Sequence, residues 1–244
     1  MPQTGRIFVT GDIHGYHSIG KLSTKNWTEG KELTKKDYLI VAGDFGMLWS
    51  YLRTKSEEHW LKWLDDQPWT TLFVDGNHEN FDLLENLQEK EMFGDRVGIV
   101  SHSVFHLRRG VVYRINGHKI LTIGGAHSHD RAYRKWGETM WKQEEITDAD
   151  VEKAKESLAK VNYQVDWVIS HCAPPEWAIK AMPLSQVHYY QPDGSEERLA
   201  YLRDSGLVFE KWFFGHYHTD LEDQWTEQWQ AVYHKKIELK KKEY

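Results

Sequence analysis

Side chains that commonly bind metal ions stand at the ends of five short apolar runs in this sequence. Each run is rich in β-branched and aromatic residues and ends in a polar cluster: RIFVTGDIHG, DYLIVAGDFG, TTLFVDGNHE, DWVISHCAPP and KWFFGHYH. Carboxylate, imidazole and amide groups together form a mixed nitrogen and oxygen site that suits Mn²⁺, Fe or Zn²⁺, and not a cysteine-rich structural zinc. The candidate ligands are Asp12, His14, Asp44, Asn77, His171, His216 and His218.

Two pairs among these candidates are separated by one residue, Asp12 with His14 and His216 with His218. Residues i and i+2 of an extended segment point the same way, so each pair can grip one ion. Glycines next to the clusters leave room for the backbone to approach the ions closely. The spacing therefore favours a metal site.

Each motif carries little weight by itself. A lone His171 before two prolines is more often a hydrogen-bonded histidine at a strand end than a ligand. In a chain of this composition, Gly-His-x-His arises by chance on the order of a few per cent of the time. The full set in this order is hard to explain structurally, because burying so many carboxylates and imidazoles without cations is costly.

The five apolar runs are typical of strands that are buried on both faces. Two further candidate strands, 111–115 and 119–126, flank Asn116-Gly117, which is a strong hairpin signal. In an open α/β sheet, ligands bind beyond the carboxyl ends of the strands. We therefore expect the candidate ligands to converge at one end of the sheet.

Apolar residues at helical spacing between the runs predict helices over 55–66, 80–89, 148–161 and 195–204. Thr147, with Asp150 three residues later, is the predicted cap of the third helix. Strands that alternate with helices predict an α/β fold with largely parallel strands, to which the hairpin adds an antiparallel pair.

The composition favours one soluble cytoplasmic domain over residues 1–244. The single cysteine, Cys172, rules out an intramolecular disulfide and suits a reducing compartment. The chain shows neither a secretory leader nor an apolar run long enough to span a membrane. A net charge of −6 argues against broad binding to nucleic acid. The Lys-rich segment 235–244 reads as a solvated tail.

These motifs resemble those of the calcineurin-like metallophosphoesterase superfamily: Asp-x-His, Gly-Asp, Gly-Asn-His-Asp/Glu, His and Gly-His-x-His, over residues 11–218. The resemblance implies a four-layer α/β/β/α sandwich of two mixed sheets flanked by helices. It also implies two divalent metal ions, Mn²⁺ as the first expectation and Fe, Zn²⁺ or Ni²⁺ as alternatives. One ion would be held by Asp12, His14 and His218, the other by Asn77, His171 and His216, and Asp44 would bridge them.

The resemblance implies hydrolysis of phosphoesters. Two cations about 3.5–4 Å apart lower the pKa of a bridging water and neutralise the phosphoryl oxygens during in-line attack. His78 is the candidate general acid for the leaving alkoxide, or a donor to the phosphoryl oxygens, and joins Asp44 in the predicted catalytic pair. Glu79 is expected to orient a ligand histidine.

One departure from the family bears on the substrate. Superfamily members that act as protein phosphatases have Gly-Asp-x-x-Asp-Arg at the second motif, where this chain has Met47 and Leu48 in place of the last two residues. A phosphomonoester dianion gains most from such an arginine. Its absence favours phosphodiesters of nucleotide or small-molecule type. A phosphomonoesterase acting on phosphoprotein or nucleotide, a nuclease, and a non-enzymatic binding module remain alternatives.

Two polar segments, 127–147 and 176–195, read as loops over one face that could act as a substrate lid. In the first, His127, Arg131 and Arg134 are candidate substrate contacts. The alternative is a solvated loop with aromatic residues packed beneath it.

Replacement of His78 by alanine separates chemistry from metal binding, because it removes a proposed proton donor and no proposed ligand. General acid catalysis contributes about 10²–10⁴-fold, so kcat for a poor alkoxide leaving group should fall by that order. Hydrolysis that releases nitrophenolate should fall much less, and the metal content should stay near that of the wild type. Equal losses for both substrates would instead assign His78 to the phosphoryl oxygens.

Overall fold

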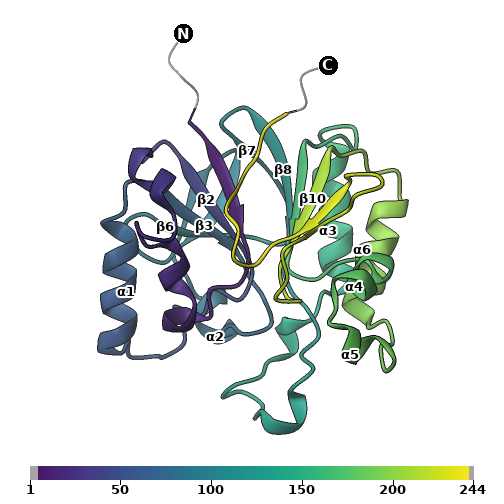
Figure 1. Cartoon of the computed structure of the whole chain (residues 1–244), viewed down its shortest axis with the longest axis horizontal. Helices are drawn as coiled ribbons and strands as arrows, with labels where there is room; N and C mark the ends of the chain where they lie inside the picture. The colour runs from purple at the N-terminus through teal and green to yellow at the C-terminus, as the bar shows by residue number, and fades with distance from the viewer. Residues whose placement is uncertain (1–4, 242–244) are drawn as a thin grey trace.

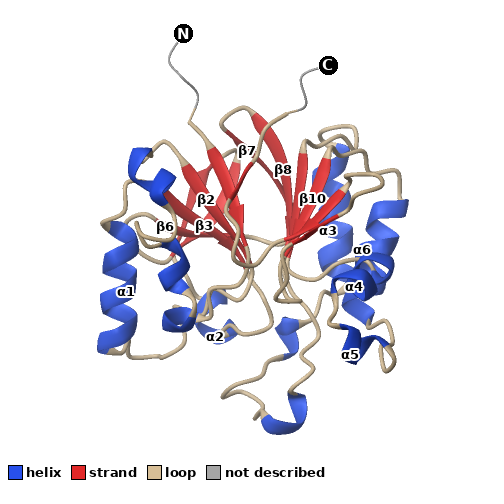
Figure 2. Ribbon diagram, viewed as in Figure 1, coloured by secondary structure: helices blue, strands red, loops and turns tan. Residues whose placement is uncertain are grey.

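Two β-sheets lie face to face at the centre of the molecule, and helices cover the outer face of each sheet (Figures 1 and 2). The computed structural model describes residues 5–241. Both sheets are mixed, with parallel strands at the centre and antiparallel strands at edges. The predicted α/β/β/α sandwich is therefore confirmed.

The first sheet contains seven strands within the described range. From one edge to the other these are β13 (Ile237–Glu238), β1 (Ile7–Thr10), β2 (Tyr38–Ala42), β3 (Thr70–Val74), β6 (Val104–Leu107), β5 (Asp95–Ile99) and β4 (Glu89–Met92). The four strands β1, β2, β3 and β6 are parallel, and the outer ones are antiparallel to their neighbours.

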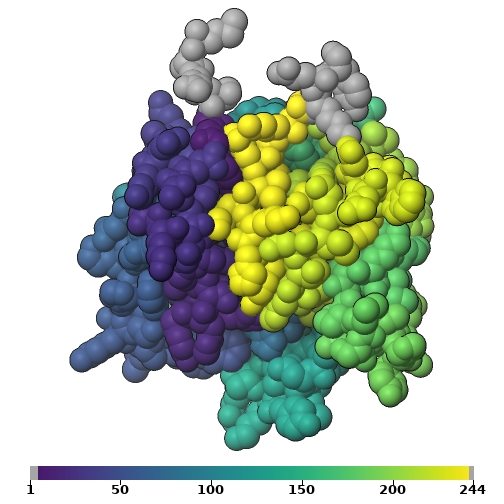
Figure 3. Space-filling view, viewed as in Figure 1, coloured from purple at the N-terminus to yellow at the C-terminus, as the bar shows by residue number. Residues whose placement is uncertain are grey.

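The pairing of β13 with β1 corrects the prediction of a solvated tail over 235–244. Val9 pairs with Ile237 and Phe8 with Glu238, so the end of the chain lies against its beginning (Figure 3). The backbone hydrogen bonds of this edge outweigh the polar composition of the segment. Residues 242–244 lie outside the described range.

The second sheet contains six strands within residues 5–241. In order these are β11 (Leu221–Glu222), β12 (Trp229–Ala231), β10 (Lys211–Phe214), β9 (Trp167–Ser170), β8 (His118–Ile123) and β7 (Val111–Ile115). The four middle strands are parallel. Strands β7 and β8 form the predicted hairpin, with positive φ angles of 48° at Asn116 and 86° at Gly117.

The helices form the two outer layers of the sandwich (Figure 1). The first sheet is covered by α1 (Lys55–Asp65), α2 (Phe81–Glu85) and the short 3-10 helices η1 (Gly15–His17), η2 (Ile19–Leu22) and η3 (Thr28–Glu32). The second is covered by α3 (Asp148–Ala159), α4 (Pro175–Ala181), α5 (Leu184–Val187) and α6 (Gly194–Asp204). Three of the four predicted helices therefore have nearly the predicted bounds.

The structure also differs from the sequence prediction at 80–89 and 176–195, and it contains strands β5, β6, β11 and β12, which the sequence did not predict. The helix expected over 80–89 ends at Glu85, because Glu89–Met92 pairs with β5 as an exposed strand whose polar residues give no apolar alternation. The prediction that 176–195 is an irregular loop was wrong, because this segment contains most of α4, all of α5 and the start of α6. Helix α4 buries Trp177, Ala178 and Ala181, a stripe too short to stand out in the sequence.

The segment 127–147 is largely irregular, as predicted, and contains only the 3-10 helices η4 (Arg131–Tyr133) and η5 (Lys142–Glu144) within it. In the view of Figures 1 and 3 it projects below the two sheets, in teal. We refer to it as the 127–147 loop.

Burial on both faces explains the continuous apolar runs of the central strands. In β2, Leu39 and Val41 pack on the side of α1, while Ile40 and Ala42 pack between the sheets. All four side chains are 0 % exposed. The apolar sequence thus fixes β2 as a central strand, so the residues that follow it must leave the sheet at a fixed end.

The predicted cap of α3 is confirmed and can be tested. Thr147 Oγ1 accepts a hydrogen bond from the Asp150 backbone at 3.2 Å, and the Asp150 carboxylate accepts one from the Thr147 backbone at 2.8 Å. Thr147→Ala should lower the free energy of unfolding by about 1 kcal/mol, which lowers the melting temperature by about 2–4 °C. Glu156→Ala, on the exposed face of the same helix, is the control and should change it much less.

Candidate metal centre

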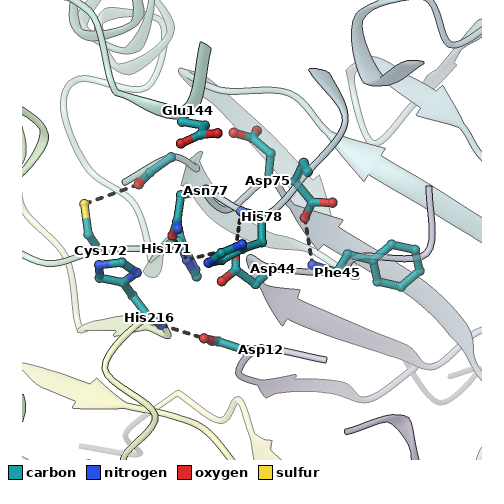
Figure 4. Close-up of polar contacts among 12 residues, drawn as sticks. Asp12, Asp44, Phe45, Asp75, Asn77, His78, Glu144, His171, Cys172 and His216 are labelled. Carbon is teal, nitrogen blue, oxygen red and sulfur yellow. Dashed lines mark hydrogen bonds and ion pairs between the residues drawn. The ribbon is translucent and has the colours of Figure 1, made fainter. Parts of the chain in front are cut away.

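The carboxyl ends of strands from both sheets meet at the lower end of the sandwich in Figure 1. Asp12 and His14 follow β1, Asp44 follows β2, Asn77 follows β3, His171 follows β9, and His216 and His218 follow β10. The structure brings these seven side chains into one cluster, part of which Figure 4 shows. Sequence alone predicted this convergence because parallel strands end at the same edge.

One group of the cluster contains Asp12, His14 and His218. Asp12 Oδ2 lies 3.1 Å from His218 Nε2 and 3.8 Å from His14 Nε2. The two imidazole nitrogens are themselves 2.9 Å apart. One ligand atom from each residue therefore lies within 4.8 Å of the others, close enough for all three to share an ion.

A second group is built around Asp44. His171 Nε2 lies 3.3 Å from Asp44 Oδ1 and 3.0 Å from Asn77 Oδ1. Asp12, Asp44 and His171 also place ligand atoms within 4.8 Å of one another, which links the two groups. The His216 ring lies 4.9 Å from the His171 ring, measured between centroids.

The backbone at this cluster adopts conformations that side-chain-bearing residues rarely take. His14, Asp44, His216 and His218 have positive φ angles of 49°, 48°, 66° and 50°. Such left-handed backbone is strained for residues other than glycine and tends to persist at functional sites. The sharp turns at the strand ends bring the polar side chains together, and the strained backbone is the energetic cost of this arrangement.

Gly43 is required because the chain passes close to the cluster. A Cβ atom at this position would lie 2.1 Å from Nδ1 of His171, and the φ angle there is +91°. No other residue fits both the space and the backbone angle. The sequence signal, a glycine directly before Asp44, therefore has a steric cause.

Burial and charge inside the cluster oppose each other. Burial by itself would raise the pKa of both carboxyl groups, but His218 near Asp12 and His171 near Asp44 hold each pKa below its usual range. Burial by itself would lower the pKa of His171, but Asp44 raises it to about 9. The buried carboxylates and the His171 imidazole thus stabilise one another's charged forms.

At two of the other imidazoles, burial outweighs the nearby carboxylates and the pKa is lowered. Burial lowers the pKa of His14, and burial together with nearby His171 lowers the pKa of His216 to about 3. These two rings are therefore neutral at neutral pH and carry lone pairs that can bind a cation.

The residues present fit divalent metal ions. Asp12 Oδ2 is buried, and although the His218 imidazole lies 3.1 Å away the geometry gives this oxygen no hydrogen bond, which is costly for a carboxylate unless a cation lies against it. Two carboxylates, four imidazoles and one amide oxygen form a donor set typical of divalent transition metals. Lys21 does not replace the cation at the carboxylate, because its Nζ donates to the backbone carbonyls of Gly11, Asp12 and Tyr233.

The side chain of Asn77 is held from the side away from the other ligands. Its Nδ2 donates to Ser128 Oγ at 2.9 Å, and Ser128 Oγ donates to Glu144 Oε2 at 2.6 Å. Glu144 is fully buried and pairs with Arg134 at 2.7 Å. This chain of hydrogen bonds directs Oδ1 of Asn77 towards His171, and sequence reasoning missed Ser128 and Glu144 because nothing local marks them.

His78 lies at the edge of the cluster. Its backbone N–H donates to Asp44 Oδ1 at 2.8 Å (Figure 4). Its side chain is 35 % exposed. Its Nε2 lies 3.9 Å from Asp130 Oδ2 of the 127–147 loop. The carboxylate near His78 therefore comes from this loop and not from the second motif, where Met47 stands.

Glu79 does not orient a histidine, which corrects the sequence expectation. Its buried carboxylate accepts hydrogen bonds from the backbone of Phe45 at 2.7 Å and Gly46 at 3.2 Å. Burial, and then the charge of Asp44, raise the pKa of Glu79 to about 8. It fastens the turn that carries Asp44 to the turn that carries Asn77.

The three predicted substrate contacts of the 127–147 loop all interact with glutamates. His127 and Arg131 both contact Glu145, the first with Nδ1 at 3.0 Å. The Arg134 side chain is 6 % exposed and is held by Glu144, so it supports the loop from inside. Their contact with substrate stays a prediction.

The fold is an α/β/β/α sandwich with carboxylate, imidazole and amide side chains at the carboxyl ends of its strands. This combination is typical of metal-dependent phosphoesterases. The chain belongs to the family described as calcineurin-like phosphoesterase, whose model matches residues 5–220. It is therefore a phosphoesterase; the family implies divalent metal ions, and the structure offers candidate groups of ligands for them.

Solved structures with a similar fold exist. A crystal structure of a candidate 5′-nucleotidase from Staphylococcus aureus in complex with α-ketoglutarate matches with a TM-score of 0.51 and 15 % identity. The match covers 93 % of this chain and 48 % of that one, so this chain spans about half its length and the likeness shows the fold alone. The phosphopantetheinyl hydrolase of Mycobacterium tuberculosis matches with a TM-score of 0.43 and 15 % identity, over 96 % of this chain and 91 % of the other. No curated protein matches the sequence.

Across the described residues, no helix is both long and apolar enough to cross a membrane.

Removal of the Ser128 hydroxyl tests the support of Asn77. Ser128→Ala frees the amide to rotate, and loss of such a supporting partner typically costs about 10–100-fold in metal affinity. Isothermal titration calorimetry with Mn²⁺ or Zn²⁺ measures the change. Ser205→Ala, which removes a hydroxyl bonded to the Leu202 carbonyl, is the matched control. Unchanged affinity in Ser128→Ala would mean that Asn77 is either fixed by other contacts or not a ligand.

Proposed function

We propose that this enzyme hydrolyses phosphodiesters of nucleotide or small-molecule type at a site holding two divalent metal ions. When bound, such ions lower the pKa of a water molecule and neutralise phosphoryl oxygens. The proposed ligands of one ion are Asp12, His14 and His218, those of the other are Asn77, His171 and His216, and Asp44 is shared. The clustering of these side chains about two buried carboxylates supports this assignment.

The pairing of both loop arginines supports diesters over monoesters. Arg131 is paired with Glu145 and Arg134 with Glu144, so each guanidinium already has a carboxylate beside it that neutralises its charge. A monoester dianion gains most from a free arginine fork, whereas a diester carries one negative charge. This is the observation that carries the preference.

The residues around the centre have distinct proposed tasks. His78 donates a proton to the leaving alkoxide or a hydrogen bond to a phosphoryl oxygen, and its partial exposure lets it reach the substrate. Asp44 fixes the backbone of His78 through the 2.8 Å hydrogen bond to its N–H. Asp130 supplies a carboxylate beside the imidazole, and the 127–147 loop is proposed as the lid that carries it.

A comparison of esters tests this proposal. Protein reconstituted with Mn²⁺, Zn²⁺, Ni²⁺ or Fe is assayed on bis-nitrophenyl phosphate, nitrophenyl phosphate and a single-stranded oligonucleotide. The diester should have at least about tenfold higher kcat/KM than the monoester, because a charge-assisted hydrogen bond worth ~1.5–3 kcal/mol is lacking for the second charge. Chelation should abolish activity.

Asp44→Asn is the control variant for this assay. Loss of a carboxylate at the junction of the two ligand groups should lower metal content and reduce turnover to background, even with excess Mn²⁺. Near-normal turnover would show that Asp44 is not shared. A preference for the monoester or the oligonucleotide would replace the proposed substrate class with a phosphatase or a nuclease.

A further inference from the structure

A cavity of about 380 Å³ opens next to the candidate metal centre, on the side of α1. His14 and His78 line its inner end, and Tyr16, Met47, Trp49 and Trp60 are among its walls. The volume falls in the range of small-molecule sites. A group attached to a phosphoryl at the metal centre would therefore reach directly into this space.

Apart from the imidazoles of His14, His17 and His78, few ionisable groups line the cavity. Neither a lysine nor an arginine is among the described residues that line it, and its one carboxylate belongs to Glu57. That carboxylate accepts hydrogen bonds from the backbones of Trp49, Ser50 and Thr54, each at 2.8 Å. Burial alone would raise the pKa of Glu57, but these donors lower it to about 2. The Glu57 carboxylate is therefore bound to the backbone of the cavity wall.

The apolar wall coincides with the departure at the second motif. Met47 and Leu48 stand where the protein phosphatases of the family have aspartate and arginine, and they are 1 % and 6 % exposed. Met47 itself lines the cavity. The chain thus has an apolar side chain in the place of a charged group at this wall, which favours an apolar substituent over a second phosphate.

Of the aromatic residues in the cavity wall, Trp49 is held by neighbouring residues, whereas Tyr16 is exposed. The Trp49 carbonyl accepts a hydrogen bond from Asn80 Nδ2 at 2.7 Å, and the Trp49 ring packs edge-on against Trp141 with centroids 5.8 Å apart. Tyr16, which also lines the cavity, is 61 % exposed, and its ring lies against His17 with centroids 4.2 Å apart. A large exposed aromatic ring beside a preformed cavity offers a face on which a flat group can stack.

We propose that this cavity binds the esterified group of the substrate, and that this group is an uncharged planar ring of the kind found in a nucleobase or an aryl alcohol. The inference rests on the proposed phosphodiesterase function and names the substrate class for it. Stacking on Tyr16 and Trp49 would hold the ring while the phosphoryl lies at the metal centre.

Three diesters with similarly poor alkoxide leaving groups test the inference: dimethyl phosphate, benzyl methyl phosphate and thymidine 5′-methyl phosphate. Their consumption by the Mn²⁺-reconstituted enzyme is followed by phosphorus NMR. The two aromatic esters should exceed dimethyl phosphate in kcat/KM by about 5- to 100-fold, the range that stacking of one base provides. A higher value for the thymidine ester than for the benzyl ester identifies a nucleobase, and equal values identify any aryl group.

In Tyr16→Ala, the ratio of kcat/KM for the aromatic esters to kcat/KM for dimethyl phosphate should fall close to one. Because the Tyr16 side chain is exposed, its removal should leave the fold intact, and the melting temperature checks this. Trp49→Leu is the second variant. Tyr201→Ala, an exposed tyrosine on α6, is the matched control and should keep the full preference. Equal rates for all three diesters in the wild type, or an unchanged preference in both cavity variants, would overturn the inference and leave the proposed function standing.

Failure of the proposed function gives a different result. A protein that hydrolyses none of the three diesters with any of the metals contradicts the phosphodiesterase proposal. The cavity is then judged by calorimetry of benzyl methyl phosphate and dimethyl phosphate with the metal-free protein. Tighter binding of the benzyl ester that Tyr16→Ala removes would support the aromatic site, and equal binding would reject it.

Discussion

The burial of two carboxylates, Asp12 and Asp44, at the junction of two sheets is the constraint on which the rest of this structure depends. Both are almost inaccessible to water, at 0 % and 2 % exposed. Buried charge of one sign is tolerated only when opposite charge or hydrogen-bond donors surround it. Imidazoles and backbone N–H groups meet part of this demand, and the divalent ions that the family implies would meet the rest.

Backbone donors from distant segments converge on these carboxylates and thereby tie the strand ends together. The His216 N–H donates to Asp12 Oδ1 at 3.0 Å, which joins β10 of one sheet to β1 of the other (Figure 4). The His78 N–H donates to Asp44 Oδ1 and so joins the turn after β3 to the turn after β2 within the first sheet. Left-handed backbone at four of the candidate ligands is the conformational cost of this convergence, and the two packed sheets hold it in place.

The surroundings of the centre divide into a polar side and an apolar side. On the polar side, Ser128, Glu144 and Arg134 of the 127–147 loop form a buried network that ends on Asn77. On the other side, the cavity beside α1 is lined by aromatic residues and by Met47. A buried network that is fully bonded specifies one geometry, whereas an apolar cavity gains affinity from the area it covers.

The sequence by itself predicted most central strands but not Val104–Leu107 and Trp229–Ala231, and it predicted most helices and the seven residues of the candidate metal cluster. These follow from local patterns, since a strand buried on both faces is continuously apolar and the residue after it must leave the sheet at a known edge. The strand Glu89–Met92, helix α4 and the pairing of Ile237–Glu238 were decided only by tertiary structure, because their partners lie elsewhere and their own sequences are too polar or too short. The same holds for Asp130 beside His78 and for the aromatic cavity, which arise where segments distant in sequence come together, and no periodicity within one segment encodes that proximity.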